Sequence, residues 1–138
     1  DGRYIQPTRQ PAFAIFEDSI KPILAAASRL LEPDSYLLRL LLTRLPAGTQ
    51  IALHQDKGTT LRFVHRMHVA VITHPDVMFQ VGDEQRNLAA GEIWEINNCR
   101  THGVTNFSDV NRVHLIMDWV TPSLARQHLR HRLQAAGS

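Results

Sequence analysis

The sequence predicts a mainly β domain, folded as a sandwich or a barrel, with one helix before the strands and one after them. Between residues 36 and 120, short apolar runs are separated by turn signals at close and regular spacing, a pattern typical of antiparallel sheets and not of βαβ units. The chain has 138 residues, a length that predicts a single domain around one core. We expect strands near residues 36–45, 49–54, 63–73, 77–81, 85–88, 92–96, 102–106 and 110–120.

An N-terminal helix is predicted over residues 16–32, after an extended lead-in at 1–15. Apolar residues recur on one stripe of this helix, so we expect it to pack against a sheet. Asp18 or Ser19 is the expected N-cap. This choice places Pro22 in the first turn, the part of a helix where proline is tolerated.

The C-terminal residues complete the expected fold, and the composition of the chain limits its expected partners and its cellular compartment. Residues 36–120 form the expected barrel core, and residues 122–135 predict a short C-terminal helix. The formal net charge is +2 with scattered Lys and Arg, which argues against nucleic-acid binding. Cys99 is the single cysteine, so we expect no disulfide framework and a reducing, cytoplasmic setting. No apolar run is long enough to cross a bilayer, and we therefore expect no membrane partner.

One candidate metal site is visible in the sequence. His54 and Asp56 are two residues apart at the end of a predicted strand, where side chains at i and i+2 share a face. His102, at the start of a distant strand, is the best candidate for a third ligand. Two histidines and one carboxylate on one face of a metal, with open positions opposite, are favoured by non-heme Fe(II) oxygenases. Zinc in a tetrahedral site is the second choice.

The apolar surroundings of Arg112 indicate which chemical group a ligand at this site would carry. Its neighbours Val110, Leu115 and Ile116 are apolar, and a guanidinium in such a setting needs a partner, of which a carboxylate held by a bidentate fork is the natural one. A co-substrate with a carboxylate far from its metal-binding end fits this need, and 2-oxoglutarate is such a molecule. The competing interpretation is a salt bridge from Arg112 to a protein acid, either Asp118 or Glu95.

Three stretches of the sequence together resemble one known family. They are TRLPAGTQIALHQD, HRMHVAV and FQVGDEQRNLAAGEIWEINNCRTHGVTNFSDVNRVHLIMDW, within residues 43–119. These stretches resemble the aspartyl/asparaginyl β-hydroxylase family, Fe(II)- and 2-oxoglutarate-dependent oxygenases that include bacterial free L-proline hydroxylases. The resemblance implies a double-stranded β-helix, a jelly-roll or cupin-like barrel, with the N-terminal helix packed on the sheet and a short C-terminal helix.

The resemblance also implies roles for individual residues. It implies that His54 and His102 ligate iron and that Arg112 grips the far carboxylate of 2-oxoglutarate. The best-known vertebrate member lacks the carboxylate ligand, whereas this chain has Asp56 and is more similar to the bacterial free-amino-acid hydroxylases. We therefore expect a complete triad of His54, Asp56 and His102. The further residues implied to bind the co-substrate or to line its pocket are Thr43, Arg66 and His68.

The implied function is a dioxygenase that uses Fe(II), 2-oxoglutarate and O2. It hydroxylates an unactivated C–H bond of an amino acid or aminoacyl residue, with release of succinate and CO2. A free amino acid is the preferred substrate, since Arg66 is a spare cation for a carboxylate, but a peptide or a natural-product intermediate stays open. The alternatives are a peptidyl Asp or Asn β-hydroxylase, a non-catalytic cupin-like metal- or ligand-binding module, and a zinc hydrolase. The oligomeric state is open, as is a segment before Asp1.

The remaining histidines are assigned to structure or surface, because none has a partner at ligand spacing. His114 is the exception to recheck, since it lies two residues after Arg112 and could share its face. The residues so assigned are His65, His74, His114, His128 and His131.

Overall fold

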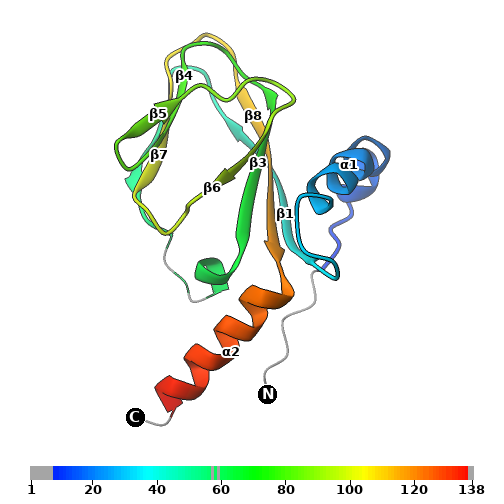
Figure 1. The fold of residues 1–138 in the computed structure, drawn as a ribbon. Coiled ribbons are helices and arrows are strands. Elements are labelled where there is room, and N and C mark those ends of the chain that lie inside the picture. The colour runs from blue at the N-terminus through cyan, green and yellow to red at the C-terminus, as the bar shows by residue number, and fades with distance from the viewer. Residues whose placement is uncertain (1–7, 57, 59, 137–138) are drawn as a thin grey trace.

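Two four-stranded antiparallel sheets face each other, with a helix outside one of them (Figure 1). The structure, a computed structural model, describes residues 8–56, 58 and 60–136. The strands are β1 Tyr36–Leu45, β2 Gln50–His54, β3 His65–Ile72, β4 Val77–Val81, β5 Glu84–Arg86, β6 Ile93–Ile96, β7 His102–Asn106 and β8 Arg112–Val120. The helices are α1 Phe13–Ser28, the 3-10 helix η1 Thr60–Phe63 and α2 Pro122–Ala136.

The strand order defines the fold. The first sheet has the order β1-β8-β3-β6 and the second sheet the order β2-β7-β4-β5. Sequence neighbours β1 and β2 therefore lie in different sheets, as in eight-stranded jelly rolls of the cupin type. The prediction of a mainly β, double-stranded β-helix with a helix at each end is confirmed. Two predicted strands begin two residues later than expected, at His65 and Arg112, the first because η1 occupies residues 60–63.

The N-terminal helix differs from its predicted bounds. α1 begins at Phe13 and ends at Ser28, so the extended lead-in predicted for 1–15 is wrong at its end, while residues 1–7 lie outside the described residues. The predicted cap is also wrong, because Asp18 and Ser19 lie inside α1 and its N-cap, Ala12, makes no side-chain hydrogen bond. Pro22 lies in the middle of α1. Burial of the apolar stripe, which starts at Phe13, stabilises the helix despite the missing proline N–H.

The first sheet packs apolar side chains on its outer face and carries both apolar and polar buried side chains on its inner face. Alternate residues of β3 and β8 pack outward against α1 in one core cluster: Ile20, Ala27, Met67, Val69, Leu115, Met117 and Trp119. A second core cluster lies between the two sheets: Leu45, Ala70, Val77, Phe79, Leu88, Ile96 and Val104. The other alternate residues of β8 point inward and include Arg112, His114 and Asp118, all buried. A polar row inside a barrel needs partners, so the interior of the barrel is where a ligand site is expected.

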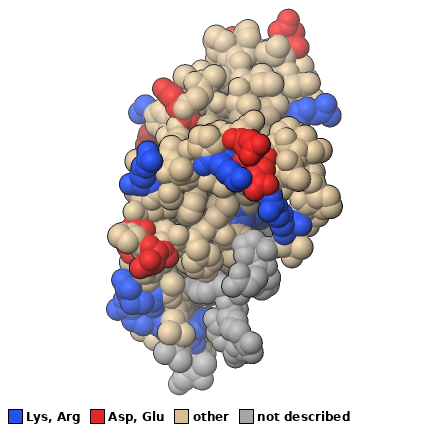
Figure 2. All heavy atoms as spheres, turned by 90° about the vertical axis from the view of Figure 1, so that its right-hand side faces the viewer, with Lys and Arg blue, Asp and Glu red and all other residues tan. Residues whose placement is uncertain are grey.

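The outer surface carries charges of both signs. Seen from the side of α1, Lys and Arg side chains are interspersed with Asp and Glu and form no continuous basic stripe (Figure 2). α2 extends away from the end of β8 (Figure 1). Among the described residues, no helix has the length and the apolar character that a bilayer-spanning segment needs.

Candidate metal centre

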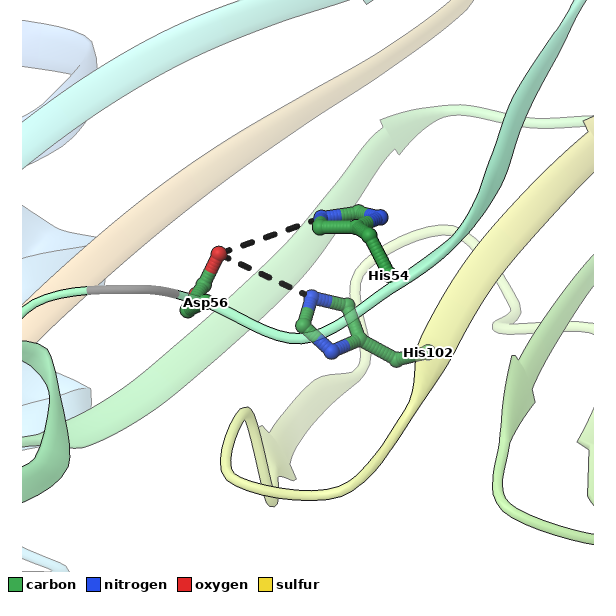
Figure 3. A group of neighbouring side chains, drawn as sticks. All are labelled: His54, Asp56 and His102. Carbon is green, nitrogen blue, oxygen red and sulfur yellow. Dashed lines mark ion pairs between the residues drawn. The ribbon is translucent and has the colours of Figure 1, made fainter.

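The two sheet strands that carry the predicted histidines are hydrogen-bonded neighbours. His54 ends β2, His102 begins β7, and the two residues are directly paired in the antiparallel register. Their imidazole rings lie 4.4 Å apart between centroids. Asp56 follows two residues after His54, beyond the end of β2, and its carboxylate points at both rings (Figure 3). The structure thus brings together all three residues of the predicted triad.

The distances within this group suit a shared cation. Asp56 Oδ1 lies 3.8 Å from His54 Nε2 and 4.0 Å from His102 Nε2, and one possible ligand atom from each residue lies within 4.8 Å of the others. Bonds of roughly 2.0–2.2 Å to one metal place two donor atoms at most about 4.4 Å apart. A shift of less than about 1 Å would bring all three atoms into ligand positions.

The backbone fixes which imidazole nitrogen can bind a metal. His54 Nδ1 lies 2.8 Å from the carbonyl oxygen of Ala52, and His102 Nδ1 lies 3.0 Å from that of Arg100. A carbonyl oxygen only accepts hydrogen bonds, so both Nδ1 atoms carry the proton and donate. Both Nε2 atoms therefore keep a free lone pair directed at Asp56, which is the usual arrangement of metal-binding histidines. The residues present fit a divalent cation.

Asp56 divides its two oxygens between different partners. Oδ1 faces the two histidines, whereas Oδ2 accepts hydrogen bonds from Arg66 and, at 3.4 Å, from Asn98 Nδ2. Arg66 in turn donates from Nε and Nη2 to the two oxygens of Asp118, at 2.8 Å and 3.1 Å. The prediction that Arg66 is a spare cation is wrong, because two protein carboxylates already hold it.

Arg112 is a buried cation that pairs with no carboxylate of the described residues. Only 2% of the residue is exposed, and its Nη2 donates to His114 Nδ1 at 2.6 Å, while its Nε has no hydrogen-bond partner within the described part of the chain. The competing interpretation, a salt bridge from Arg112 to Asp118 or Glu95, is wrong among the described residues. Asp118 pairs with Arg39 and Arg66, and Glu95 pairs with His65. Burial lowers the pKa of Arg112 to about 10, which still leaves it charged at neutral pH.

Two histidines beside Arg112 also have unpartnered nitrogen atoms. His68 Nδ1 and His114 Nε2 are buried and make no hydrogen bond to residues that the structure describes, and the two rings meet edge to face with centroids 5.8 Å apart. Burial first, and the charge of Arg112 second, lower the pKa of His114 to about 3. Burial chiefly, with the nearby positive charges, holds the pKa of His68 well below its usual range. Both rings are therefore neutral at pH 7 and available to hydrogen-bond with a ligand.

Thr43 on β1 and His114 on β8 lie side by side next to Arg112. Thr43 is the cross-strand partner of His114 and donates from Oγ1 to its carbonyl oxygen at 3.2 Å. His114, which the sequence assigned to structure or surface, is 1% exposed and contacts Arg112 directly, so a surface role is wrong. The i, i+2 spacing from Arg112, which marked His114 as the exception among these histidines, correctly indicated that the two residues share a face.

The fold and the site define a cupin-like β-barrel with a histidine–aspartate–histidine group that could hold a metal ion. The profile of the aspartyl/asparaginyl β-hydroxylase family matches residues 24–122. The chain belongs to this family, which confirms the resemblance seen in the sequence. A search among curated proteins found no match.

Several solved structures are similar. The non-heme monooxygenase ThoJ, in a complex with Ni, is 25% identical with a TM-score of 0.56, over 72% of this chain and 50% of that one. This chain thus spans half the length of ThoJ. A cupin 2 barrel protein from Salinispora arenicola is 12% identical (TM-score 0.46, 70% of this chain and 82% of that one). A cupin domain from Bordetella pertussis is 17% identical (TM-score 0.46, 62% and 90%).

Proposed function

We propose that this chain is an Fe(II)- and 2-oxoglutarate-dependent dioxygenase. It hydroxylates an unactivated C–H bond of an amino acid or aminoacyl residue and releases succinate and CO2. The observation that carries the proposal is the pairing of two features in one barrel: three metal-ligand donors within 4.8 Å of one another, and a buried guanidinium with an unpartnered Nε. ThoJ, a non-heme monooxygenase solved as a nickel complex, supports metal binding by a barrel of this kind.

In this proposal the three protein ligands hold the metal, and the metal and its co-substrates supply the oxidation. Bound Fe(II), together with 2-oxoglutarate and O2, supplies the oxidation that inserts one oxygen atom into a C–H bond while the other enters succinate. His54 Nε2, His102 Nε2 and Asp56 Oδ1 would hold the metal in this proposal, and three protein ligands are fewer than Fe(II) accepts, so positions would remain for co-substrate and substrate. The backbone carbonyls on the two Nδ1 atoms hold both rings in the ligating orientation.

Arg112 binds the distal carboxylate of 2-oxoglutarate in this proposal. A buried charge without a counter-ion is destabilising, and a carboxylate removes that penalty. Because His114 Nδ1 accepts a hydrogen bond from Arg112, the proton of this neutral ring is on Nε2. His114 Nε2 is then a second donor for the same carboxylate, with Thr43 as the cross-strand neighbour of His114 and His68 in edge-to-face contact with its ring.

We propose an amino acid or an aminoacyl residue as the substrate. A free amino acid is our first choice, because the triad is complete, and a peptidyl Asp or Asn is the alternative that the family description favours. The single cysteine supports a cytoplasmic location.

Anaerobic spectroscopy and product analysis test the proposal. Fe(II) and 2-oxoglutarate added without O2 should produce a weak visible charge-transfer band, and O2 should then yield succinate and a substrate heavier by one oxygen atom. Arg112→Met should lose the 2-oxoglutarate-dependent band, whereas the control Arg44→Met, an exposed arginine on the same sheet, should keep it. Metal binding without the band and without succinate would instead identify a binding module or a zinc enzyme.

A further inference from the structure

The three metal-ligand donors are held in place by different means. His54 and His102 lie on paired strands, and each ring is fixed by a backbone carbonyl. Asp56 lies outside β2, in the segment that leads to η1, so no strand pairing fixes its backbone. The orientation of its carboxylate therefore depends on side chains, of which Arg66 is the charged one.

Arg66 is itself held by a carboxylate on the neighbouring strand. Arg66 on β3 is the cross-strand partner of Asp118 on β8, and two parallel hydrogen bonds of 2.8 Å and 3.1 Å join them. This bidentate geometry fixes the plane of the guanidinium. All three nitrogens of Arg66 thus contact protein carboxylates, with Nη1 directed at Asp56 Oδ2.

Asp118 is anchored from its other side as well. It is fully buried, and it pairs across the sheet with Arg39 on β1, whose Nε donates to Asp118 Oδ2 at 2.7 Å. Arg39, Asp118 and Arg66 therefore form a row across three adjacent strands, and this row ends at Asp56. Burial opposes the charge of Arg66, but the hydrogen bond and charge of Asp118, with the charge of Asp56, raise its pKa overall.

We propose that Arg66 and Asp118 are positioning residues for the metal ligand Asp56. Arg66 holds Asp56 Oδ2, so that Oδ1 stays directed at the two histidine Nε2 atoms. This inference rests on the proposed function only in that Asp56 must bind a metal.

Metal affinity without co-substrate is the decisive measurement. Co(II) is titrated into metal-free protein, with calorimetry for affinity and the visible absorption of Co(II) for coordination. Arg66→Met should weaken Co(II) binding by about 10–100-fold, the usual effect of removing a group that orients a ligand. Arg66→Lys, which keeps the charge but not the fork, should recover part of the loss. Arg44→Met, the matched control on the first sheet, should bind Co(II) as the wild type does.

A double-mutant cycle separates positioning from a general structural role. In an Asp56→Ala background, Arg66→Met should weaken Co(II) binding no further, because the group that it positions is gone. An equal loss in both backgrounds would overturn the proposal, as would unchanged Co(II) affinity in Arg66→Met combined with weaker 2-oxoglutarate binding. If Arg66→Met does not fold, Asp118→Asn, which keeps the shape but weakens the hold on Arg66, is measured in the same cycle.

Co(II) binding by the wild-type protein distinguishes a failure of the proposed function from a failure of the positioning role of Arg66. Wild-type protein that is folded but does not bind Co(II) contradicts the proposed function as well. Wild-type protein that binds Co(II), with an unaffected Arg66→Met variant, contradicts the positioning role alone.

Discussion

Replacing His114 with glutamine should flatten the dependence of stability on pH. The pKa of His114 is about 3 in the folded chain against an ordinary 6.5, chiefly because of burial. Below pH 6.5 the unfolded chain binds a proton at this residue and the folded chain does not, so the free energy of unfolding falls as the pH falls. At about pH 5, which is about 1.5 units below 6.5, the loss is about 2 kcal/mol, at about 1.4 kcal/mol per unit.

Urea unfolding of metal-free protein at about pH 7.5 and about pH 5 measures this effect. The wild type should lose about 2 kcal/mol more than His114→Gln between the two pH values, a difference of about 1 M in urea midpoint for a slope of about 2 kcal/mol/M. His128→Gln on the exposed helix α2 is the matched control and should change the dependence much less.

An identical pH dependence in wild type and His114→Gln would refute the reasoning. NMR of the imidazole provides an independent check, because the Cε1–H signal of His114 should not titrate above about pH 5 in the folded protein.

Three other substitutions have defined outcomes. Met117→Ala, at a fully buried position between α1 and the first sheet, should lower the free energy of unfolding by about 2–5 kcal/mol in urea denaturation. Arg112→Met should weaken 2-oxoglutarate binding, measured by calorimetry, by at least about tenfold. The ligand-free variant should be as stable as the wild type or more stable, because the substitution removes a buried charge that has no counter-ion. A large loss of stability would contradict this. Gly82→Ala should destabilise by about 1–2 kcal/mol, because Gly82 has a φ of 58° and an added Cβ would displace the guanidinium of Arg100.

Much of the fold was predictable because strands and turns have local signals. The eight strands follow from apolar runs between turn residues, and each is present within a few residues of its predicted position. The start of α1 was not predictable from capping residues, because packing of Phe13 and Ile20 on the first sheet decides where the helix begins. Tertiary contacts outweigh local preference there.

The triad was also predictable, since the i, i+2 spacing of His54 and Asp56 pointed to a shared face, although Asp56 lies just beyond the end of β2. The contacts of Arg66 with Asp118 and Asp56 were not, because they depend on the register between β3 and β8 and on the path of the chain after β2. A sequence shows which residues share a strand face but not which residue on another strand lies opposite. This is why Arg66 looked unpaired in the sequence and is paired in the structure.

The first sheet packs buried side chains on both of its faces, so the barrel needs α1 to cover the outer one. An ordinary sandwich buries its apolar side chains between the sheets, but here a large share of them lies outside, beneath one helix. The family match starts at residue 24, inside α1, so a protein trimmed to the matched region would uncover Met67, Leu115 and Met117 to water. Shortened proteins that keep every residue of the metal centre but lack the start of α1 should therefore aggregate. Only those that retain the chain from Phe13 onward should stay in solution.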